Sequence, residues 1–416
     1  MNPLSATTTI DAAVGIRWDA VVVGAGPAGG AAALRLARHG LQVLLIDRGS
    51  LPRGKLCGCC LAPAAITELR RLEIGESGPL ARAVPLHRIH VATGRHRAAI
   101  DVQGGATLSR ETLDATLAAA AIAAGARWLP ETAALAIDEH DADEPLIRVT
   151  VRGTGAADGH TTRLECRRIL LATGLAASVR MPGGAALDRP AFVAPRSRIG
   201  IGAVLPATAA TLPPGELLMA VADCGYCGIV RLEDGRIDVA AAVDRQTLAA
   251  IGPSATLRRI VNAACGPAGG WASLDDLDTV AMRATPGLTR SAPLVVGRAR
   301  NVWRVGDAAG YVEPFTGEGM GWALVAARLA ADALCAAGRG ELEPAFDAAG
   351  RYVTTHAGYF RPRHARCRRV AAAVRRPRIM NLAVRAAQLA PWAARLAVPT
   401  VTGGHVGGRS SVGGAA

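Results

Sequence analysis

Short apolar runs and helical segments alternate at the start of the chain. Residues 19–23 form a continuous apolar run, which is typical of a buried parallel strand. Residues 31–38 have the composition of a helix that a glycine ends, and residues 41–46 form a second buried run that leads into Asp47. The pattern predicts a complete βαβ unit within residues 18–47.

Two further kinds of strand follow along the chain. Residues 84–102 and 127–168 alternate between apolar and polar positions, which predicts first a hairpin and then a small β-meander. Residues 168–172 and 301–306 are each predicted to form a buried strand, and we expect these strands to return to the parallel sheet. Many short alternating runs in residues 190–295 predict an antiparallel sheet and hence a second lobe.

The C-terminal part of the chain has a helical pattern. An alanine-rich helix is predicted from residue 322 to about residue 337, and residues 346–402 are both helical in pattern and very basic. Eight arginines fall within residues 361–378, where the proline after Arg376 is expected to interrupt the helix. At the two ends of the chain, we predict a flexible tail in residues 1–16 and a disordered tail in residues 403–416.

The turn after the first strand carries three glycines in G-x-G-x-x-G spacing. The first permits a tight turn, the second lets the backbone approach a pyrophosphate, and the third lets helix and strand pack closely. The helix N-terminus offers free N–H groups and positive partial charge to phosphates, and the acid after the second strand can accept hydrogen bonds from ribose hydroxyls. The unit therefore predicts dinucleotide binding through Gly24, Gly26, Pro27, Ala28, Gly29, Asp47 and Arg48.

Composition narrows the classes of function. Half of the 416 residues are hydrophobic but only 3% are aromatic, so a large core must be built from Ala, Val and Leu. The net charge of +13 is carried by arginine, and because no aromatic residues alternate with the basic ones, we predict no nucleic-acid partner. Nine cysteines, without a secretion signal or an apolar run of about 18 residues, predict a cytoplasmic protein with reduced thiols.

Residues 51–66, directly after the βαβ unit, are rich in cationic and thiol side chains. They contain two cations that we expect near the phosphates, and a dense group of thiols: Arg53, Lys55, Cys57, Gly58, Cys59 and Cys60. The single lysine of an arginine-rich chain indicates a need for a compact, rotatable ammonium, whereas small cysteines in a loop can also pack simply as apolar residues. Together with Cys224 and Cys227, which have C-x-x-C spacing, these thiols could form a redox disulfide, and the sequence leaves this question open. The flanking residues do not form a zinc knuckle, so we predict no metal site.

A second cation stands at the start of a predicted helix. Residues 108–126 predict a helix that Ser109 caps. Arg110 follows the cap, where a positive charge is unfavourable to the helix dipole. This placement is explained if Arg110 faces an anion such as a pyrophosphate, and equally well if it is an exposed side chain.

Taken in order, residues 18–345 resemble one superfamily, the flavoproteins related to class A flavin monooxygenases and geranylgeranyl reductases. GAGPAGG with Asp47 is similar to its FAD fingerprint, and SRETLDATL resembles the helix whose arginine contacts FAD phosphate, which here is Arg110. RGKLCGCCL resembles a segment that lies beside the flavin. The contacts that this last segment implies are Lys55, Cys57 and Gly58.

VGDAAGYVEPFTGEGMGWAL, which begins at residue 305, closely resembles the second FAD motif of the superfamily. On this match Asp307 would bind the ribityl chain and Pro314 would lie against the flavin ring. The glycine-rich backbone that follows would point a helix N-terminus at the N1–C2=O edge, where it stabilises the anion of reduced flavin. The implied contacts are Gly306, Asp307, Pro314, Gly317, Gly319 and Met320.

The resemblance also implies the fold. We expect an α/β protein with a Rossmann-like FAD-binding domain, glutathione-reductase-like and of the para-hydroxybenzoate-hydroxylase type, and an antiparallel-sheet substrate domain. The FAD-binding domain is expected in residues 17–85, 105–189 and 296–345. The substrate domain is expected in residues 86–104 and 190–295, with basic helices in residues 346–402.

Two departures from the family pattern bear on the reaction. Thr173-Gly174 stands where class A hydroxylases usually carry Asp-Gly, which puts direct docking of a nicotinamide cofactor in doubt. The stretch from Tyr226 to Arg231 lacks the Trp and Pro that geranylgeranyl reductases often carry, which weakens a prenyl-saturating activity.

The resemblance implies an FAD-dependent oxidoreductase that acts on a lipophilic or aromatic small molecule of polyketide or prenyl type, with NADPH or NADH as a candidate electron donor. Hydroxylation with oxygen and hydride reduction of an activated double bond are both open. In the second case Cys57 is the candidate acid and Lys55 a group that tunes it. The alternatives are a flavin-bound protein without catalysis and an NAD-dependent dehydrogenase, against which the second FAD motif argues.

Residues 361–390 place basic and apolar side chains on helical spacing. This pattern predicts either a solvated helical cover or a peripheral membrane contact that serves a lipophilic substrate. A nucleic-acid patch is the third interpretation, and the lack of interleaved aromatic residues disfavours it.

Overall fold

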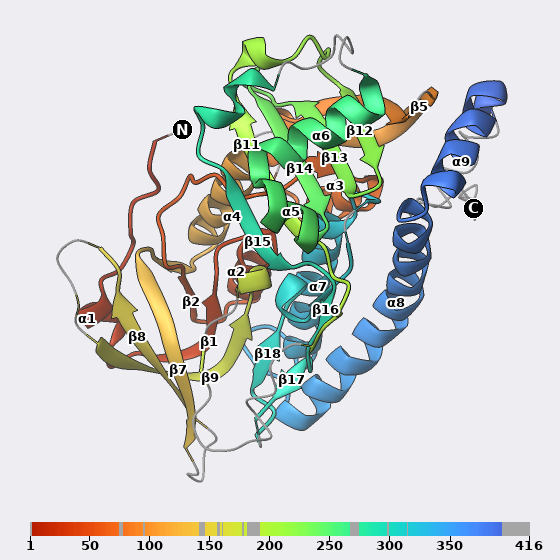
Figure 1. Ribbon diagram of the computed structural model, residues 1–416. Helices are drawn as coiled ribbons and strands as arrows, with labels where there is room; N and C mark the ends of the chain where they lie inside the picture. The colour runs from red at the N-terminus through yellow and green to blue at the C-terminus, as the bar shows by residue number, and fades with distance from the viewer. Residues whose placement is uncertain are drawn as a thin grey trace, which may run out of the picture.

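The computed structural model describes residues 2–74, 78–94, 96–140, 146–155, 159, 161–176, 179–180, 192–266, 274–297, 299–313 and 315–392. These residues form two lobes, each built on a sheet, and a long helix runs along one side of both (Figure 1). The predicted α/β fold with a Rossmann-like sheet and a second, largely antiparallel sheet is confirmed.

The first lobe is organised on a parallel sheet around β1 (Arg17–Val23). Its strand order is β17-β18-β9-β1-β2-β6, and β1 pairs in parallel with β2 and β9. Because side chains alternate along a strand, Ala20 and Val22 pack toward the helices, whereas Val21 and Val23 pack toward β7 and β8. The other strands are β2 (Val43–Ile46), β6 (Arg127–Leu129), β7 (Thr132–His140), β8 (Leu146–Gly153), β9 (Thr161–Leu171), β17 (Val295–Val296) and β18 (Val302–Arg304).

Alanine-rich helices cover one face of this sheet. α2 (Pro27–Arg38) packs against both α4 (Arg110–Ala123) and α7 (Gly319–Leu334), and α3 (Pro63–Arg70) packs against α7. The buried alanines of α2 and α7 let these helices approach closely. As predicted, Ser109 caps α4, since its Oγ accepts a hydrogen bond from the Thr112 N–H at 3.1 Å. Both α2 and α7 begin earlier than predicted, because each glycine-rich turn leads directly into a helix.

The second lobe has the strand order β15-β11-β14-β13-β12-β4-β5-β3. One face packs against α6 (Pro253–Cys265), which follows α5 (Arg245–Ile251), and the other face looks toward the first lobe. A small third sheet has the strand order β10-β16-β19. The strands are β3 (Cys60–Leu61), β4 (Val84–Thr93), β5 (His96–Thr107), β10 (Phe192–Val193), β11 (Ile199–Leu205), β12 (Glu216–Ala222), β13 (Gly225–Arg231), β14 (Ile237–Val243), β15 (Arg283–Gly287), β16 (Arg290–Ser291) and β19 (Gly310–Tyr311).

The N-terminal residues are not the loose tail that we predicted. The Leu4 N–H donates to the Leu51 carbonyl at 2.8 Å, and the Thr7 N–H donates to the Trp128 carbonyl at 3.0 Å. A short helix, α1 (Ile10–Ala13), follows and buries Ala13 against the sheet. Composition alone gave no sign of these contacts, because they are made with distant parts of the chain.

The predicted meander and the predicted strand at 168–172 are one continuous element. β9 pairs with β8 along its first part and then joins β1 and β18 in the parallel sheet. A single long strand therefore carries the chain from the meander back into the centre of the first lobe.

Two basic helices complete the described chain. α8 (Ala345–Val374) packs on α7, and α9 (Pro377–Leu389) packs on β4 and β5 (Figure 1). The predicted break lies between them, where Arg376 has a non-helical conformation ahead of the proline. Residues 393–402 and the tail predicted for 403–416 lie outside the described residues.

Candidate functional site

A cavity of about 2200 Å³ separates the two lobes. Single small-molecule sites usually measure about 300–1,000 Å³, so this cavity has room for more than one ligand. One end is lined by the glycine-rich turn, α4 and the start of α7. The other end is lined by β4, β5, β12 and α9.

The first end contains the predicted dinucleotide turn. Gly24 has φ +104°, and a Cβ there would lie 2.5 Å from the Ala172 carbonyl oxygen, so both the conformation and the packing require glycine. Gly29 packs against the Gly24 backbone, as its predicted role demands. α2 then begins at Pro27 without a side-chain cap, which leaves its first N–H groups directed at the cavity.

Asp47 is held rigidly over this turn. One carboxylate oxygen accepts a hydrogen bond from the Ala25 N–H at 2.8 Å, and the other accepts one from the Gly49 N–H at 3.1 Å. Arg53 donates to the same carboxylate at 2.6 Å, so it lies at the ribose end of the site rather than at the phosphate end that we predicted. Arg48 also lines this part of the cavity.

Two cations converge on the N-terminus of α2. A Cβ at Gly26 would lie 3.3 Å from Arg110 Nη2 and 3.5 Å from Lys55 Nζ. Both cations also contact Asp114, which Arg110 meets with two hydrogen bonds of 3.0 and 2.7 Å and Lys55 at 3.6 Å. Of the two explanations for Arg110, the structure favours the one in which it faces an anion.

Burial acts differently on these two cations. It lowers the pKa of Lys55 more than the Asp114 carboxylate raises it. Burial also tends to lower the pKa of Arg110, but Asp114 and the Cys57 sulfur outweigh it, so the net shift is upward. Arg110 is therefore a permanent positive charge beside the turn, which suits a pyrophosphate.

The second predicted motif meets the first across the cavity. Gly306 has φ +67° and packs against Ala28, and Asp307 follows it and lines the cavity. Burial raises the pKa of Asp307 to about 6, although Arg110 opposes the shift. α7 begins at Gly319 without a side-chain cap, and Gly317, Gly319 and Met320 line the same space. Pro314 lies outside the described residues.

Unpaired polar atoms also line this end. Within the described chain, Thr173 Oγ1 and Arg53 Nε are buried and have no hydrogen-bond partner. With the open cradle at Gly26 and two uncapped helix N-termini, they fit a ligand that carries phosphates, hydroxyls and a polar ring edge. These residues therefore fit a dinucleotide such as FAD.

Two thiols of the cavity form a coupled pair. The Cys59 thiol donates a hydrogen bond to Cys57, which lowers the pKa of Cys57 to about 6 against the opposing effect of burial, and Arg110 lowers it further. The same bond and burial raise the pKa of Cys59 well above its ordinary value. Cys59 also has a left-handed backbone, with φ +50°, which is uncommon for a residue other than glycine. Of the two thiols, Cys57 is therefore the more readily ionised.

This pairing bears on the expected role of Cys57. A proton donor works best with a pKa near the working pH, so Cys57 stays the candidate acid, whereas the raised pKa of Cys59 makes it a weak one. Sequence reasoning did not separate the two thiols, because their difference comes from a hydrogen bond and from Arg110. Sequence reasoning also missed Asp238 on β14, a buried carboxyl whose pKa is raised by burial and by Cys57. Its position as the one acid in an otherwise apolar strand was a signal that could have identified it.

The cysteines do not pair across the lobes. All described cysteines are free. Cys224 and Cys227 pack in the core beneath α6, whereas Cys57, Cys59 and Cys60 line the cavity on the other face of the sheet. The disulfide that the spacing left open between the two groups is therefore absent among the described residues.

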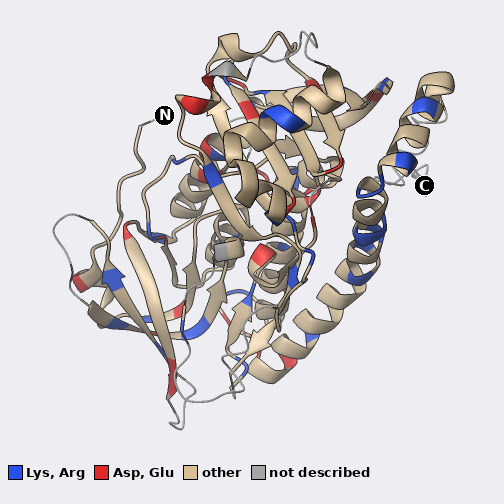
Figure 2. Cartoon of the chain, in the orientation of Figure 1, with Lys and Arg blue, Asp and Glu red and all other residues tan. Residues whose placement is uncertain are grey.

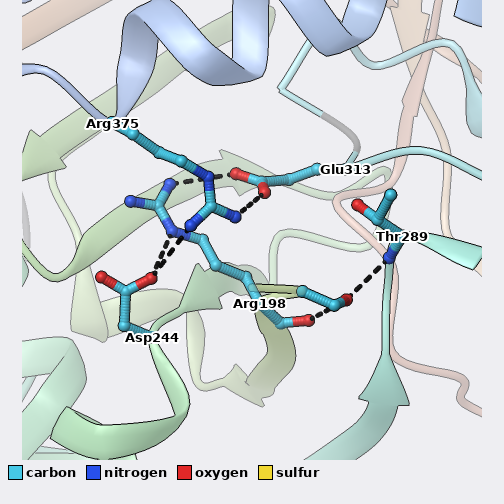
Figure 3. A network of polar contacts seen from close by, with 6 residues as sticks. Arg198, Asp244, Thr289, Glu313 and Arg375 are labelled. Carbon is cyan, nitrogen blue, oxygen red and sulfur yellow. Dashed lines mark hydrogen bonds and ion pairs between the residues drawn. The ribbon is translucent and has the colours of Figure 1, made fainter. Parts of the chain in front are cut away.

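A buried charge network lies beside the cavity (Figure 3). Arg198 Nη1 contacts Glu313 at 3.0 Å, and Arg198 Nε contacts Asp244 at 2.9 Å. Arg375, at the end of α8, contacts Glu313 at 2.6 Å. Glu313 belongs to the second FAD-like motif, so this network ties that motif to the second sheet and to the C-terminal helices. No periodicity in the sequence pointed to it.

The comparisons with known proteins agree with this geometry. Residues 18–190 match the family described as pyridine nucleotide-disulphide oxidoreductase. The chain is 30% identical over 339 residues to the menaquinone reductase of Mycobacterium tuberculosis, and this alignment covers 76% of each of the two chains. It is 32% identical over 173 residues to a probable electron transfer flavoprotein-quinone oxidoreductase of Escherichia coli, which covers 38% of this chain and 37% of that protein.

Solved structures share the fold at low identity. The p-nitrophenol 4-monooxygenase of Pseudomonas putida superposes with a TM-score of 0.69 at 15% identity, covering 94% of this chain and 99% of that chain. The FAD-dependent chondrochloren halogenase of a myxobacterium gives 0.68 at 18% identity and covers 92% of both chains.

Proposed function

Because this chain belongs to the family of FAD-dependent oxidoreductases that contains the menaquinone reductases, we propose that it reduces a carbon–carbon double bond in a long, lipophilic substrate of prenylated-quinone or polyketide type. The observation that carries this proposal is the apolar end of the cavity. Residues of β4, β5, β12 and α9 line this end, which we call the apolar passage. The side chains that line it include Leu86, Ile89, Val91, Ile100, Val102, Leu217, Met219, Met380 and Val384.

Once reduced by a two-electron donor such as NADPH or NADH, bound FAD would supply a hydride to one carbon of the double bond, and the protein would supply orientation and a proton. Gly24, Gly26 and Arg110 would hold the pyrophosphate, and Asp47 the ribose. Asp307 would bind the ribityl chain, and the uncapped N-terminus of α7 would stabilise negative charge at the ring edge.

The second proton would come from the coupled thiols. Cys57 has a pKa of about 6 and accepts a hydrogen bond from Cys59, and both residues line the cavity. Protonation of the second carbon by the Cys57 thiol would leave a thiolate that this hydrogen bond stabilises, and solvent would then restore the proton. Lys55 and Arg110 would keep the resulting negative charge tolerable.

The test starts from the purified protein with its flavin. We expect flavin absorption bands, or their appearance when FAD is added. The chemically reduced enzyme, incubated anaerobically with menaquinone, should return to the oxidised spectrum. Its product, read by mass spectrometry after any quinol has been reoxidised in air, should still carry two additional hydrogen atoms, because a saturated double bond is not reoxidised. Cys57→Ala should slow this step while leaving the flavin bound.

Hydroxylation is the competing outcome of the same experiment. A product that gains an oxygen atom only when air is admitted, with no change under anaerobic conditions, would show that the reductase proposal is wrong. Absence of bound flavin after addition of FAD would overturn the cofactor assignment itself.

A further inference from the structure

α9 presents an apolar face to the outside of the molecule. Leu382 is 70% exposed and Leu389 is 79% exposed, and the two lie seven residues apart on the same side of the helix. Trp392, just beyond the helix, is 69% exposed. Among the described residues, these are the most exposed large apolar side chains of the chain.

The surroundings of this face are strongly basic. Residues 348–392 contain ten arginines and no aspartate or glutamate. Arg378 and Arg385 are also seven residues apart, and they lie about 40° around the helix from the exposed leucines. Figure 2 shows the basic residues along the upper part of α8 and on α9. An apolar stripe with arginines beside it is the pattern of a helix that lies in the interface of an anionic bilayer.

The inner face of α9 closes the apolar end of the cavity. Met380 and Val384 are buried and line the cavity, while Ala386 and Ala390 line it at the accessible edge of the helix. The passage toward the flavin site therefore starts beside the same helix that carries the exposed leucines.

α9 is held in this position by polar contacts. Thr93 of β4 donates a hydrogen bond to Asn381 Oδ1 at 2.9 Å. At the other end, Arg375 joins the network with Glu313 and Asp244, directly before the break between α8 and α9 (Figure 3). The outward direction of the leucines is thus a fixed feature of the fold.

We propose that α9 docks on an anionic membrane surface, with Leu382, Leu389 and Trp392 in the acyl boundary and Arg378 and Arg385 on the lipid phosphates. The cavity mouth then faces the bilayer, so a lipophilic substrate enters from the membrane without crossing water. This route for the substrate rests on the proposed function, whereas the docking itself does not. In the described part of the chain, no helix is long and apolar enough to cross a membrane.

The test is flotation of the full-length holoprotein with vesicles of phosphatidylglycerol and phosphatidylcholine, compared with vesicles of phosphatidylcholine alone. The wild type should float with the anionic vesicles and be released by salt. Each arginine near an anionic surface contributes about 1 kcal/mol, so R378Q/R385Q should bind about 30-fold more weakly. L382Q/L389Q should lose binding at all salt concentrations, and the control I251Q, on the exposed face of α5, should bind like the wild type.

Two results would overturn the docking proposal. One is that the wild type floats with neither kind of vesicle, or that both double variants float as the wild type does. The other is a dimer, seen by light scattering, that L382Q/L389Q dissociates, because the apolar face would then cover a second copy of the chain.

Activity separates this proposal from the proposed function. With a short-chain, water-soluble quinone, both double variants should reduce substrate like the wild type, while with menaquinone in anionic vesicles they should be slower. If neither quinone is reduced but the protein and its variants float as expected, the reductase proposal is wrong and the membrane-docking proposal is still supported.

Discussion

Arg110 allows the sharpest test of the dinucleotide site. Its guanidinium would lie 3.3 Å from a Cβ at Gly26, so it faces the N-terminus of α2, where the pyrophosphate is expected. A hydrogen bond to a charged group contributes about 1.5–3 kcal/mol. Arg110→Ala should therefore weaken FAD binding by about 10- to 150-fold.

The substitution has a second effect that must be separated from the first. Asp114 is fully buried and accepts two hydrogen bonds from Arg110, and Lys55 is 3.6 Å away. Removal of one partner of a buried ion pair costs about 3–5 kcal/mol of stability, because the other charge is left uncompensated. The double variant Arg110→Ala/Asp114→Asn removes that charge, so its loss of FAD affinity reports the missing phosphate contact.

The assay is titration of the apoprotein with FAD, followed by the quenching of flavin fluorescence, with urea unfolding as the check that each variant is folded. Arg167→Ala is the matched control, because Arg167 is exposed and its ion pair among the described residues is with Asp19, at 3.5 Å. If the folded double variant bound FAD within about threefold of the wild type, less than 1 kcal/mol, Arg110 would not contact the phosphates.

Three further predictions test groups around the cavity. Burial raises the pKa of Asp307 from 3.8 to about 6, so its contribution to stability is present below about pH 4 and is lost as pH rises through 6. In the protein without FAD, the free energy of unfolding of Asp307→Asn, measured in urea, should exceed that of the wild type by about 3 kcal/mol at pH 7 and equal it near pH 3.5. Cys59→Ala removes the bond that stabilises the Cys57 thiolate, so the pKa of Cys57, read from its ultraviolet thiolate absorbance, should rise by about one unit or more; an unchanged value would refute the coupled pair. Glu313→Gln leaves Arg198 buried beside Asp244 alone and should lower the free energy of unfolding by about 3 kcal/mol, whereas Asp223→Asn, which breaks an exposed pair, should change it by less than about 0.5 kcal/mol.

Local signals explain what the sequence could predict. The tight turn at Gly24, the acid at Asp47 and the cap at Ser109 each depend on residues a few positions away, and the structure shows all three as expected. The same holds for the break before Pro377, which follows from the stereochemistry of proline.

Contacts between distant segments could not be predicted from the sequence. Leu4 bonds to Leu51, and Glu313 pairs with Arg198 across 115 residues, with no periodicity to mark either contact. The difference in pKa between Cys57 and Cys59 depends on a hydrogen bond and on a nearby cation, which only the folded geometry supplies.

The network at Glu313 links the two ends of the cavity. Arg198 and Glu313 are each only 1% exposed, so water cannot replace their contact, and breaking it would leave a buried charge without a partner. Glu313 stands two residues before Phe315 at the cavity wall, and its second partner, Arg375, ends the helix that leads to α9. The position of α9 relative to the flavin motif is therefore fixed in the folded protein. If α9 docks on a bilayer as proposed, the substrate is the part that moves between membrane and flavin, and the length of the apolar passage decides which of its double bonds reaches the thiols.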